Sequence, residues 1–294
     1  MNRKAEVDGV ILVISCKKYL SQRVIKNPYR LVGDSIAGWK IIYVISDKTL
    51  KVDYSIEYNN KINSNLLKIK CHDDYICLFK KIVLAQRAVQ TVYHIKKGII
   101  KCDDDILFNK NLLCKYLSST LDIDFSAKRY DNKWFKNPGP EHCNKISHDK
   151  STYQYFKRNP QVYNSLKEDV KKKLNIDRGY LEFPKIPDGY GGSGGVYFLS
   201  TKASKIIVEY FKNCNCNLFY KENNGTYPFI AEDVGTAFIL CKNKIPFTPN
   251  NNLYFHITGP DTKNNLDLAM AFHTHIQGQR LGPLSPQIIQ LLTD

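Results

Sequence analysis

Long apolar runs are missing from this 294-residue sequence. No stretch of about 18 or more uninterrupted apolar residues occurs, so no membrane span is predicted. The beginning, Met1 to Asp8, is polar and leads directly into a strand-like segment, which we expect to be neither a signal peptide nor an anchor. Internal repeats and flexible linkers are also missing. We therefore expect one domain over 1–294, and the hydrophobic fraction of 43% is ample for its core.

Paired cysteines are the second absence. The nine cysteines are an odd number and follow no regular spacing. Cys214 and Cys216 are separated by one residue, which is closer than the two-residue spacing of a zinc pair. These cysteines are typical of reduced thiols, and we therefore expect a soluble cytoplasmic protein.

Acidic residues are few relative to basic ones: 28 Asp and Glu against 43 Lys and Arg, a net charge of +15. Such a charge favours a polyanionic or phosphate-bearing partner, such as nucleic acid, a nucleotide diphosphate or an acidic glycan. However, the lysines are spread over the whole chain among many Asn and Ile residues. Compositional drift in an AT-rich genome explains the charge equally well.

The hydrophobic pattern predicts strands alternating with helices. Segments 10–15, 39–46 and 66–71 are apolar, β-branched runs typical of strands buried on both faces of a parallel sheet. A helix follows over 76–95, because its apolar residues recur on one face. This alternation predicts an α/β fold with a mostly parallel sheet flanked by helices. Residues 1–125 are interpreted as a nucleotide-binding half.

Three carboxylates end the next strand. Asp103, Asp104 and Asp105 follow the segment Gly98 to Cys102, which contains the apolar pair Ile99 and Ile100. Adjacent like charges repel, and partial burial raises that cost, so a positive charge must offset them. A hard divalent cation would do so, and ligands bind at the carboxyl ends of parallel strands. The triplet therefore indicates a metal that holds a phosphate. A solvated turn with a helix cap is the alternative.

Three later motifs contain further polar residues or glycines that could lie near a ligand. The glycine-rich stretch Gly189 to Gly195 precedes a strand and permits close approach of backbone to a ligand, although such turns are also common without one. Glu232 and Asp233 precede an apolar run, as at a helix N-terminus, where the helix dipole stabilises them. His273 and His275 alternate along an extended segment, so at most one of them should face a given site.

Together these motifs, in this order, resemble the Fringe-like branch of the β1,3-glycosyltransferases, an inverting family with the GT-A fold. The resemblance spans about Val10 to about Arg280. Tyr75 and Lys81 also resemble the family pattern Tyr-x-Asn-Leu-x-x-Lys, with Cys77 replacing Asn. The segment 129–187 matches no part of the family that we can place. Its aromatic residues could stack on sugars or pack in the core.

The resemblance implies a role for each motif. Asp105, with Asp103, ligates Mn²⁺ or Mg²⁺, and His275 completes the metal site; an imidazole ligand favours manganese. Asp233 is the catalytic base, and Glu232 supports it at the helix start. The resemblance also implies a UDP-sugar donor and a glycan or glycoprotein acceptor, with the acceptor bound by the half 126–294. The residues implied to contact these substrates are Lys81, Asp103, Asp104, Gly191, Gly192, Ser193 and Gly194.

The resemblance also leaves differences and rivals. Family members are usually anchored in membranes and disulfide-bonded, whereas a soluble chain rich in Lys, Asn and Ile suits a large DNA virus, in the host cytoplasm or the virion. A metal-dependent nuclease or phosphotransferase could use the same acidic cluster, but it would normally need two metals and more carboxylates. A basic nucleic-acid-binding protein would explain the charge and leave the four motifs unexplained. We therefore expect no nucleic-acid partner.

Overall fold

The computed structural model describes residues 4–73, 77–119, 122–129, 157, 160–164, 168, 189–212, 220–222, 225–227, 232–258, 262, 265–276, 279–280 and 282–293. Tyr75 and nearly all of segment 129–187 lie outside the described residues.

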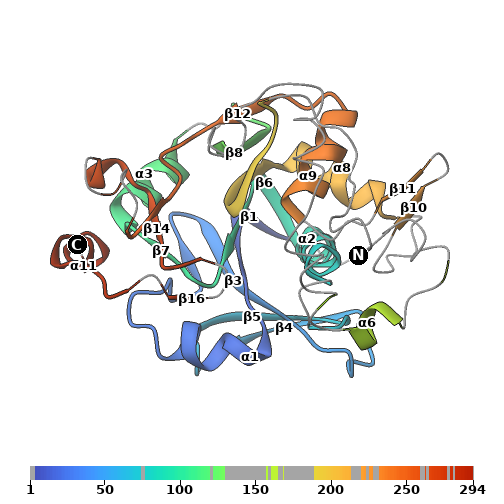
Figure 1. Ribbon diagram of the computed structural model, residues 1–294, viewed down its shortest axis with the longest axis horizontal. Coiled ribbons are helices and arrows are strands. Elements are labelled where there is room, and N and C mark those ends of the chain that lie inside the picture. The colour runs from blue at the N-terminus through green and yellow to red at the C-terminus, as the bar shows by residue number, and fades with distance from the viewer. Residues whose placement is uncertain are drawn as a thin grey trace.

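A nine-stranded sheet forms the centre of the molecule (Figure 1). Its middle strands, in the order β6-β1-β3-β5, are parallel to one another. Strands β9 and β4 flank this group and pair antiparallel with it. The predicted α/β class, with a mostly parallel sheet flanked by helices, is confirmed. The strands of the sheet are β1 (Ala5–Ile14), β2 (Ser35–Ile36), β3 (Trp39–Ser46), β4 (Tyr54–Asn59), β5 (Ser64–Ile69), β6 (Tyr93–Asp103), β8 (Phe125–Arg129), β9 (Gly192–Ser200) and β12 (Phe247–Pro249).

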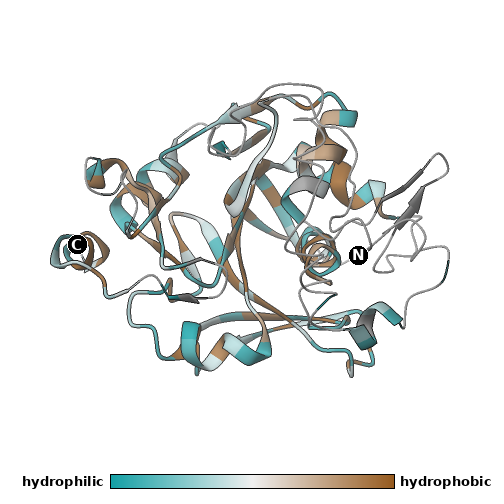
Figure 2. Cartoon of the chain, in the orientation of Figure 1, coloured by the Kyte–Doolittle hydropathy of each residue, from teal (hydrophilic) through white to brown (hydrophobic). Residues whose placement is uncertain are grey.

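The continuous apolar run of β1 is explained by burial on both faces. Ile11 and Val13 pack into one core cluster, whereas Val10, Leu12 and Ile14 pack into the other. Side chains alternate along a strand, so a strand covered on both faces needs apolar residues at every position. Hydrophobic residues accordingly concentrate along the central strands (Figure 2).

Helices cover the sheet. Helix α2 packs against β1, β5, β6 and α8, and α8 packs against α9. The helix expected over 76–95 is α2, which ends at Val92 because β6 begins at Tyr93. No helix within the described ranges combines the length and the apolar character that a membrane span requires. The helices are α1 (Lys17–Tyr19), the π-helix η1 (Leu20–Ile25), α2 (Leu78–Val92), α3 (Lys110–Ser118), α6 (Pro160–Asn164), α8 (Thr201–Tyr210), α9 (Glu232–Lys242), the 3₁₀ helix η4 (Leu266–Leu268) and α11 (Pro286–Thr293).

A smaller sheet brings the C-terminal region to the aspartates. Strand β7 (Ile106–Phe108) follows the triplet directly and pairs antiparallel with β14 (Ala271–His273), which pairs with β13 (Phe255–His256). This pairing places His273 opposite Ile106, one residue after Asp105. The remaining strands are the hairpins β10 (Tyr220–Glu222) with β11 (Gly225–Tyr227) and β15 (His275–Ile276) with β16 (Gln279–Arg280).

The described cysteines carry free thiols, as expected from their irregular spacing. No disulfide joins the cysteines in the described part of the chain. They are Cys16, Cys71, Cys77, Cys102, Cys114 and Cys241.

Candidate active site

The aspartate triplet lies where β6 turns into β7, at the carboxyl end of the parallel strands. Asp104 and Asp105 are each 8% exposed. The Ser15 hydroxyl, at the end of neighbouring β1, donates to Asp104 Oδ2 at 2.7 Å. Burial raises the pKa of Asp104 to about 6, although Ser15 and Arg23 oppose the rise. The sequence placed these carboxylates correctly at a strand end.

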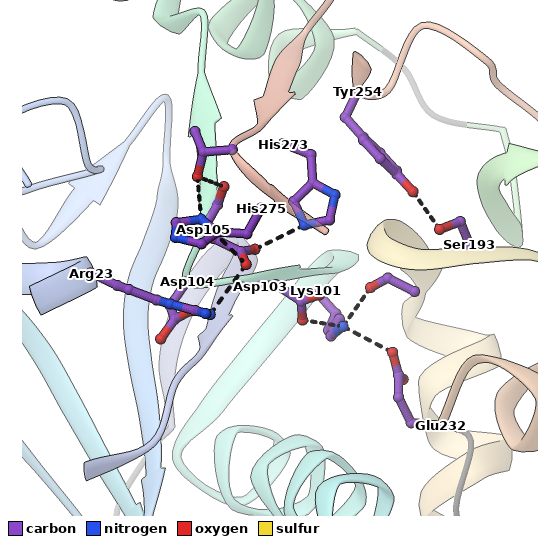
Figure 3. Close-up of polar contacts among 12 residues, drawn as sticks. Arg23, Lys101, Asp103, Asp104, Asp105, Ser193, Glu232, Tyr254, His273 and His275 are labelled. Atoms are coloured by element: carbon purple, nitrogen blue, oxygen red, sulfur yellow. Dashed lines mark hydrogen bonds and ion pairs between the residues drawn. The ribbon is translucent and has the colours of Figure 1, made fainter. Parts of the chain in front are cut away.

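Two cationic side chains of the protein itself offset the triplet (Figure 3). Arg23 Nη1, from η1, lies 3.0 Å from Asp104 Oδ1 and 3.2 Å from Asp105 Oδ2. Lys101 Nζ lies 2.7 Å from Asp103 Oδ1. The positive charge that was predicted to offset the three carboxylates is therefore supplied by Arg23 and Lys101. Repulsion among the carboxylates alone does not require a metal.

Lys101 joins the triplet to the start of α9. Its ammonium group donates to the Gly194 carbonyl and lies 2.9 Å from Glu232 Oε1, and the side chain is 1% exposed. Burial alone would lower the pKa of Lys101, but Asp103 and Glu232 raise it well above its usual value. Glu232 also accepts from the Tyr197 hydroxyl at 3.0 Å, and burial raises the pKa of Glu232 to about 7 against the influence of Lys101.

Asp233 lies in the first turn of α9, as the sequence predicted, and it is half-buried. It lies beside the glycine strand: a Cβ added to Gly194 would come within 3.3 Å of Asp233 Cβ. The Tyr254 hydroxyl donates to the Ser193 hydroxyl at this point. Burial raises the pKa of Tyr254 to about 12, and Asp103 and Asp233 add to that rise. Glu232, the residue before Asp233, is joined to Asp103 of the triplet through Lys101.

The glycines make close contacts with protein atoms. A Cβ at Gly192 would meet the Lys128 carbonyl oxygen at 2.3 Å, and one at Gly191 would meet Ala237 Cβ at 2.7 Å. Gly191 also has a φ of 87°, which favours glycine. Packing therefore explains both residues, and their contact with a ligand stays a prediction.

Both histidines lie near Asp105. His273 Nε2 is 3.2 Å from Asp105 Oδ1, and His275 Nδ1 is 3.8 Å from Oδ2. The expectation that at most one faces the site is wrong, because β14 ends at His273 and the alternation does not continue through Thr274. The Thr274 N–H and hydroxyl both donate to the Asp105 carbonyl oxygen, at 3.1 and 2.9 Å.

The electrostatics of this group favour an ionised Asp105. Burial alone would raise the pKa of Asp105, but His273, Arg23 and His275 bring it below its usual value. Burial lowers the pKa of His275, and Arg23 lowers it further. An anionic carboxylate thus lies beside an imidazole that favours its neutral form, which is the form that binds metals.

A cavity of about 350 Å³ opens beside Asp104 and Asp105. Its lining is rich in cationic and aromatic side chains from η1 and its flanks, and in residues from the C-terminal region. The cationic lining residues are Arg23, Lys26 and Arg280, and the aromatic ones are Tyr19 and Tyr29; His275, Thr274 and Leu284 also line it. The cavity therefore has an acidic wall, formed by Asp104 and Asp105, and a cationic wall, formed by Arg23, Lys26 and Arg280.

Lys81 lies near this region, at the ends of β1 and β3. Its buried Nζ donates to Asp73 Oδ1 at 2.6 Å and to the Ser15 carbonyl at 2.8 Å. Asp73 also accepts from the Ser46 N–H at 3.2 Å. Lys81 therefore holds the two strand ends together, and its contact with a nucleotide stays a prediction.

The residues around Asp105 have the chemistry of a divalent metal site. Asp105 Oδ1 is buried and makes no hydrogen bond of good geometry within the described part of the chain. Carboxylate oxygen and imidazole nitrogen are donors that Mn²⁺ accepts. Among the described residues, however, no group of three or more His, Cys, Asp or Glu side chains is arranged so that it could hold a metal ion. The types of donor atom fit a divalent metal. In the structure, the cation next to the Asp105 carboxylate is the Arg23 guanidinium.

Sequence reasoning missed Arg23, Lys26, Lys101 and Arg280. Spread over the chain, they were hidden among the 43 Lys and Arg residues. One signal was available for the first two: both follow the first parallel strand, whose carboxyl end is expected to face a ligand.

Neither protein-family models nor curated proteins gave a match to this chain. Among solved structures it is similar to a glycosyltransferase involved in glycosylation of the major capsid of PBCV-1, with 12% identity, a TM-score of 0.42, and coverage of 92% of this chain and 93% of that one. It is also similar to mouse xyloside xylosyltransferase 1, with 11% identity, a TM-score of 0.37, and coverage of 92% and 97%. A third is the galactosyltransferase LgtC in complex with donor and acceptor sugar analogs, with 11% identity, a TM-score of 0.40, and coverage of 97% and 95%. Identities and TM-scores this low establish no family membership.

Proposed function

We propose that the protein is a GT-A-type glycosyltransferase that moves a hexose or N-acetylhexosamine from a UDP-sugar to a hydroxyl of a glycan or glycoprotein. The observation that carries the proposal is the cavity beside the aspartates. It offers Arg23, Lys26 and Arg280 to an anion, and Asp105 with the His275 imidazole to a cation. A nucleotide diphosphate accompanied by a divalent metal matches both walls.

The cationic wall would hold the diphosphate. Guanidinium groups bind phosphate oxygens in paired hydrogen bonds, and Lys26 adds a point charge. Tyr19 or Tyr29 offers an aromatic face for the base or the ribose. Asp105, with His273 or His275, would hold Mn²⁺, with Asp103 as the other ligand that the sequence indicates. A metal bound there would supply Lewis-acid stabilisation of the negative charge on the leaving diphosphate.

Asp233 is the residue we propose as the general base. Its carboxylate would take the proton of the acceptor hydroxyl while that oxygen bonds to the anomeric carbon. The bond from that carbon to the diphosphate oxygen breaks, and its electron pair leaves with the diphosphate. One displacement inverts the anomeric centre. Glu232 is engaged by Lys101 and Tyr197, so its role is to position the start of α9.

A nucleotide-sugar panel tests the proposal. The protein is incubated with Mn²⁺ and each of several UDP-, GDP- and ADP-sugars, and release of the nucleoside diphosphate is measured. We expect release from at least one UDP-sugar and its loss in Asp105→Asn. Glu57→Gln is the matched control, because Glu57 pairs with Lys68 at the surface, 53% exposed. Absence of release from every donor, or equal release by Asp105→Asn, would contradict the proposal.

A further inference from the structure

Arg23 lies between the two walls of the cavity. Its single Nη1 atom reaches both Asp104 and Asp105, and its guanidinium stacks on the Tyr19 ring at 4.1 Å. The same side chain lines the cavity, where it adds to the charge of Lys26 and Arg280. It is therefore the one residue on the described cavity wall that both pairs with the triplet and belongs to the cationic group.

This position conflicts with a metal at Asp105. Arg23 Nη1 is 3.2 Å from Asp105 Oδ2, and a divalent ion bound by that carboxylate would lie within a few ångströms of the guanidinium. Two cations at such a separation repel strongly, and more so in a partly buried site. Either Arg23 moves away from Asp105, or an anion enters beside it and compensates the added charge.

A diphosphate in the cavity would supply that anion. It would give the guanidinium acceptor oxygens on the side away from Asp104 and Asp105, and the planar Arg fork suits phosphate as well as carboxylate. The short π-helix that carries Arg23 contributes one buried residue, Val24, so it has little core packing to hold it in place.

We propose that Arg23 couples the metal and the nucleotide: it occupies the acidic wall when the cavity is empty and transfers to the diphosphate when the nucleotide binds, which frees Asp105 for the metal. This inference rests on the proposed donor site and adds a property to it. The metal alone binds weakly, the nucleotide makes it bind tightly, and by linkage the metal strengthens nucleotide binding by the same factor.

Mn²⁺ binding in the absence of nucleotide tests this coupling. Free Mn²⁺ is followed by electron paramagnetic resonance during titration of wild type, Arg23→Gln and Arg30→Gln, each with and without UDP. Arg30 is the matched control, because it lies on the same segment and donates to the carbonyls of Asn27 and Ile62 instead of to a carboxylate. Arg23→Gln should bind Mn²⁺ alone about tenfold more tightly than wild type, or more, and Arg30→Gln should resemble wild type.

UDP completes the test. It should tighten Mn²⁺ binding by about tenfold or more in wild type, and by a far smaller factor in Arg23→Gln. Equal Mn²⁺ affinity in Arg23→Gln and wild type, or an undiminished effect of UDP in the variant, would overturn the inference, as would the absence of Mn²⁺ binding in both. The panel of nucleotide sugars reports separately on the transferase proposal, so either can fail while the other stands.

Discussion

Two cations neutralise the aspartate triplet from opposite sides, and their surroundings differ (Figure 3). Lys101 is 1% exposed and is held by Asp103, Glu232 and the Gly194 carbonyl. Arg23 is 14% exposed and faces a cavity. The Lys101–Glu232 ion pair is costly to rearrange because Glu232, which is 5% exposed, would be left buried without its counter-charge. The open pair can exchange partners with a ligand. The Lys101 side is therefore a fixed support, and the Arg23 side is where binding changes the contacts.

The largest expected effect is on turnover, at Asp233. Asp233→Asn should lower the transfer rate roughly 10²–10⁴-fold, because a general base contributes about that factor. Donor binding should stay near wild type, since the proposed partner of Asp233 is the acceptor hydroxyl. Rates and melting temperature are measured on the same sample.

The same variant tests the alternative in which Asp233 only stabilises the helix start. Asn caps helices as well as Asp does, so on that view both turnover and melting temperature would remain unchanged. Near-parental turnover would exclude Asp233 as the base.

Lys101→Met should cost about 3–5 kcal/mol of unfolding free energy, because Glu232, which is 5% exposed, loses its cation in a buried site. The equivalent change Arg23→Met should cost about 1–2 kcal/mol, since water in the cavity can solvate Asp104 and Asp105. Both values come from denaturant unfolding. Equal costs at the two positions would remove the distinction between a sealed side and an open one.

The free energy of unfolding should depend on pH differently in Glu232→Gln and in wild type. Burial raises the pKa of Glu232 from 4.5 to about 7, so between these values the folded protein retains a proton that the unfolded chain has released. The contribution of Glu232 to stability is therefore fully present below pH 4.5 and falls as the pH rises to about 7. From one end of this range to the other, the wild type should lose up to about 3 kcal/mol relative to Glu232→Gln. Parallel stability curves for the two proteins would refute the assignment.

The sequence predicted the sheet better than the site. The β-branched run 10–15 required burial on both faces, and the triplet marked the carboxyl end of β6, because both signals are local. Contacts between Lys101 and Glu232 or between Arg23 and Asp104 join segments 131 and 81 residues apart, and no local pattern encodes them. The strict alternation assumed for His273 and His275 was wrong because β14 ends between them. The metal, the UDP-sugar and the roles of Asp233 and Lys81 remain predictions.

The central claim is that the cationic wall of the cavity holds a nucleotide diphosphate. Calorimetric titration of UDP in the presence of Mn²⁺ tests this claim most directly. The variant is the double substitution Lys26→Gln with Arg280→Gln, which removes two charges from the cavity lining. The control is Lys61→Gln with Lys205→Gln, which removes two exposed charges outside that lining. The cavity variant should bind UDP about tenfold more weakly than wild type, or worse, and the control should bind like wild type. Equal affinity in all three proteins would contradict the claim.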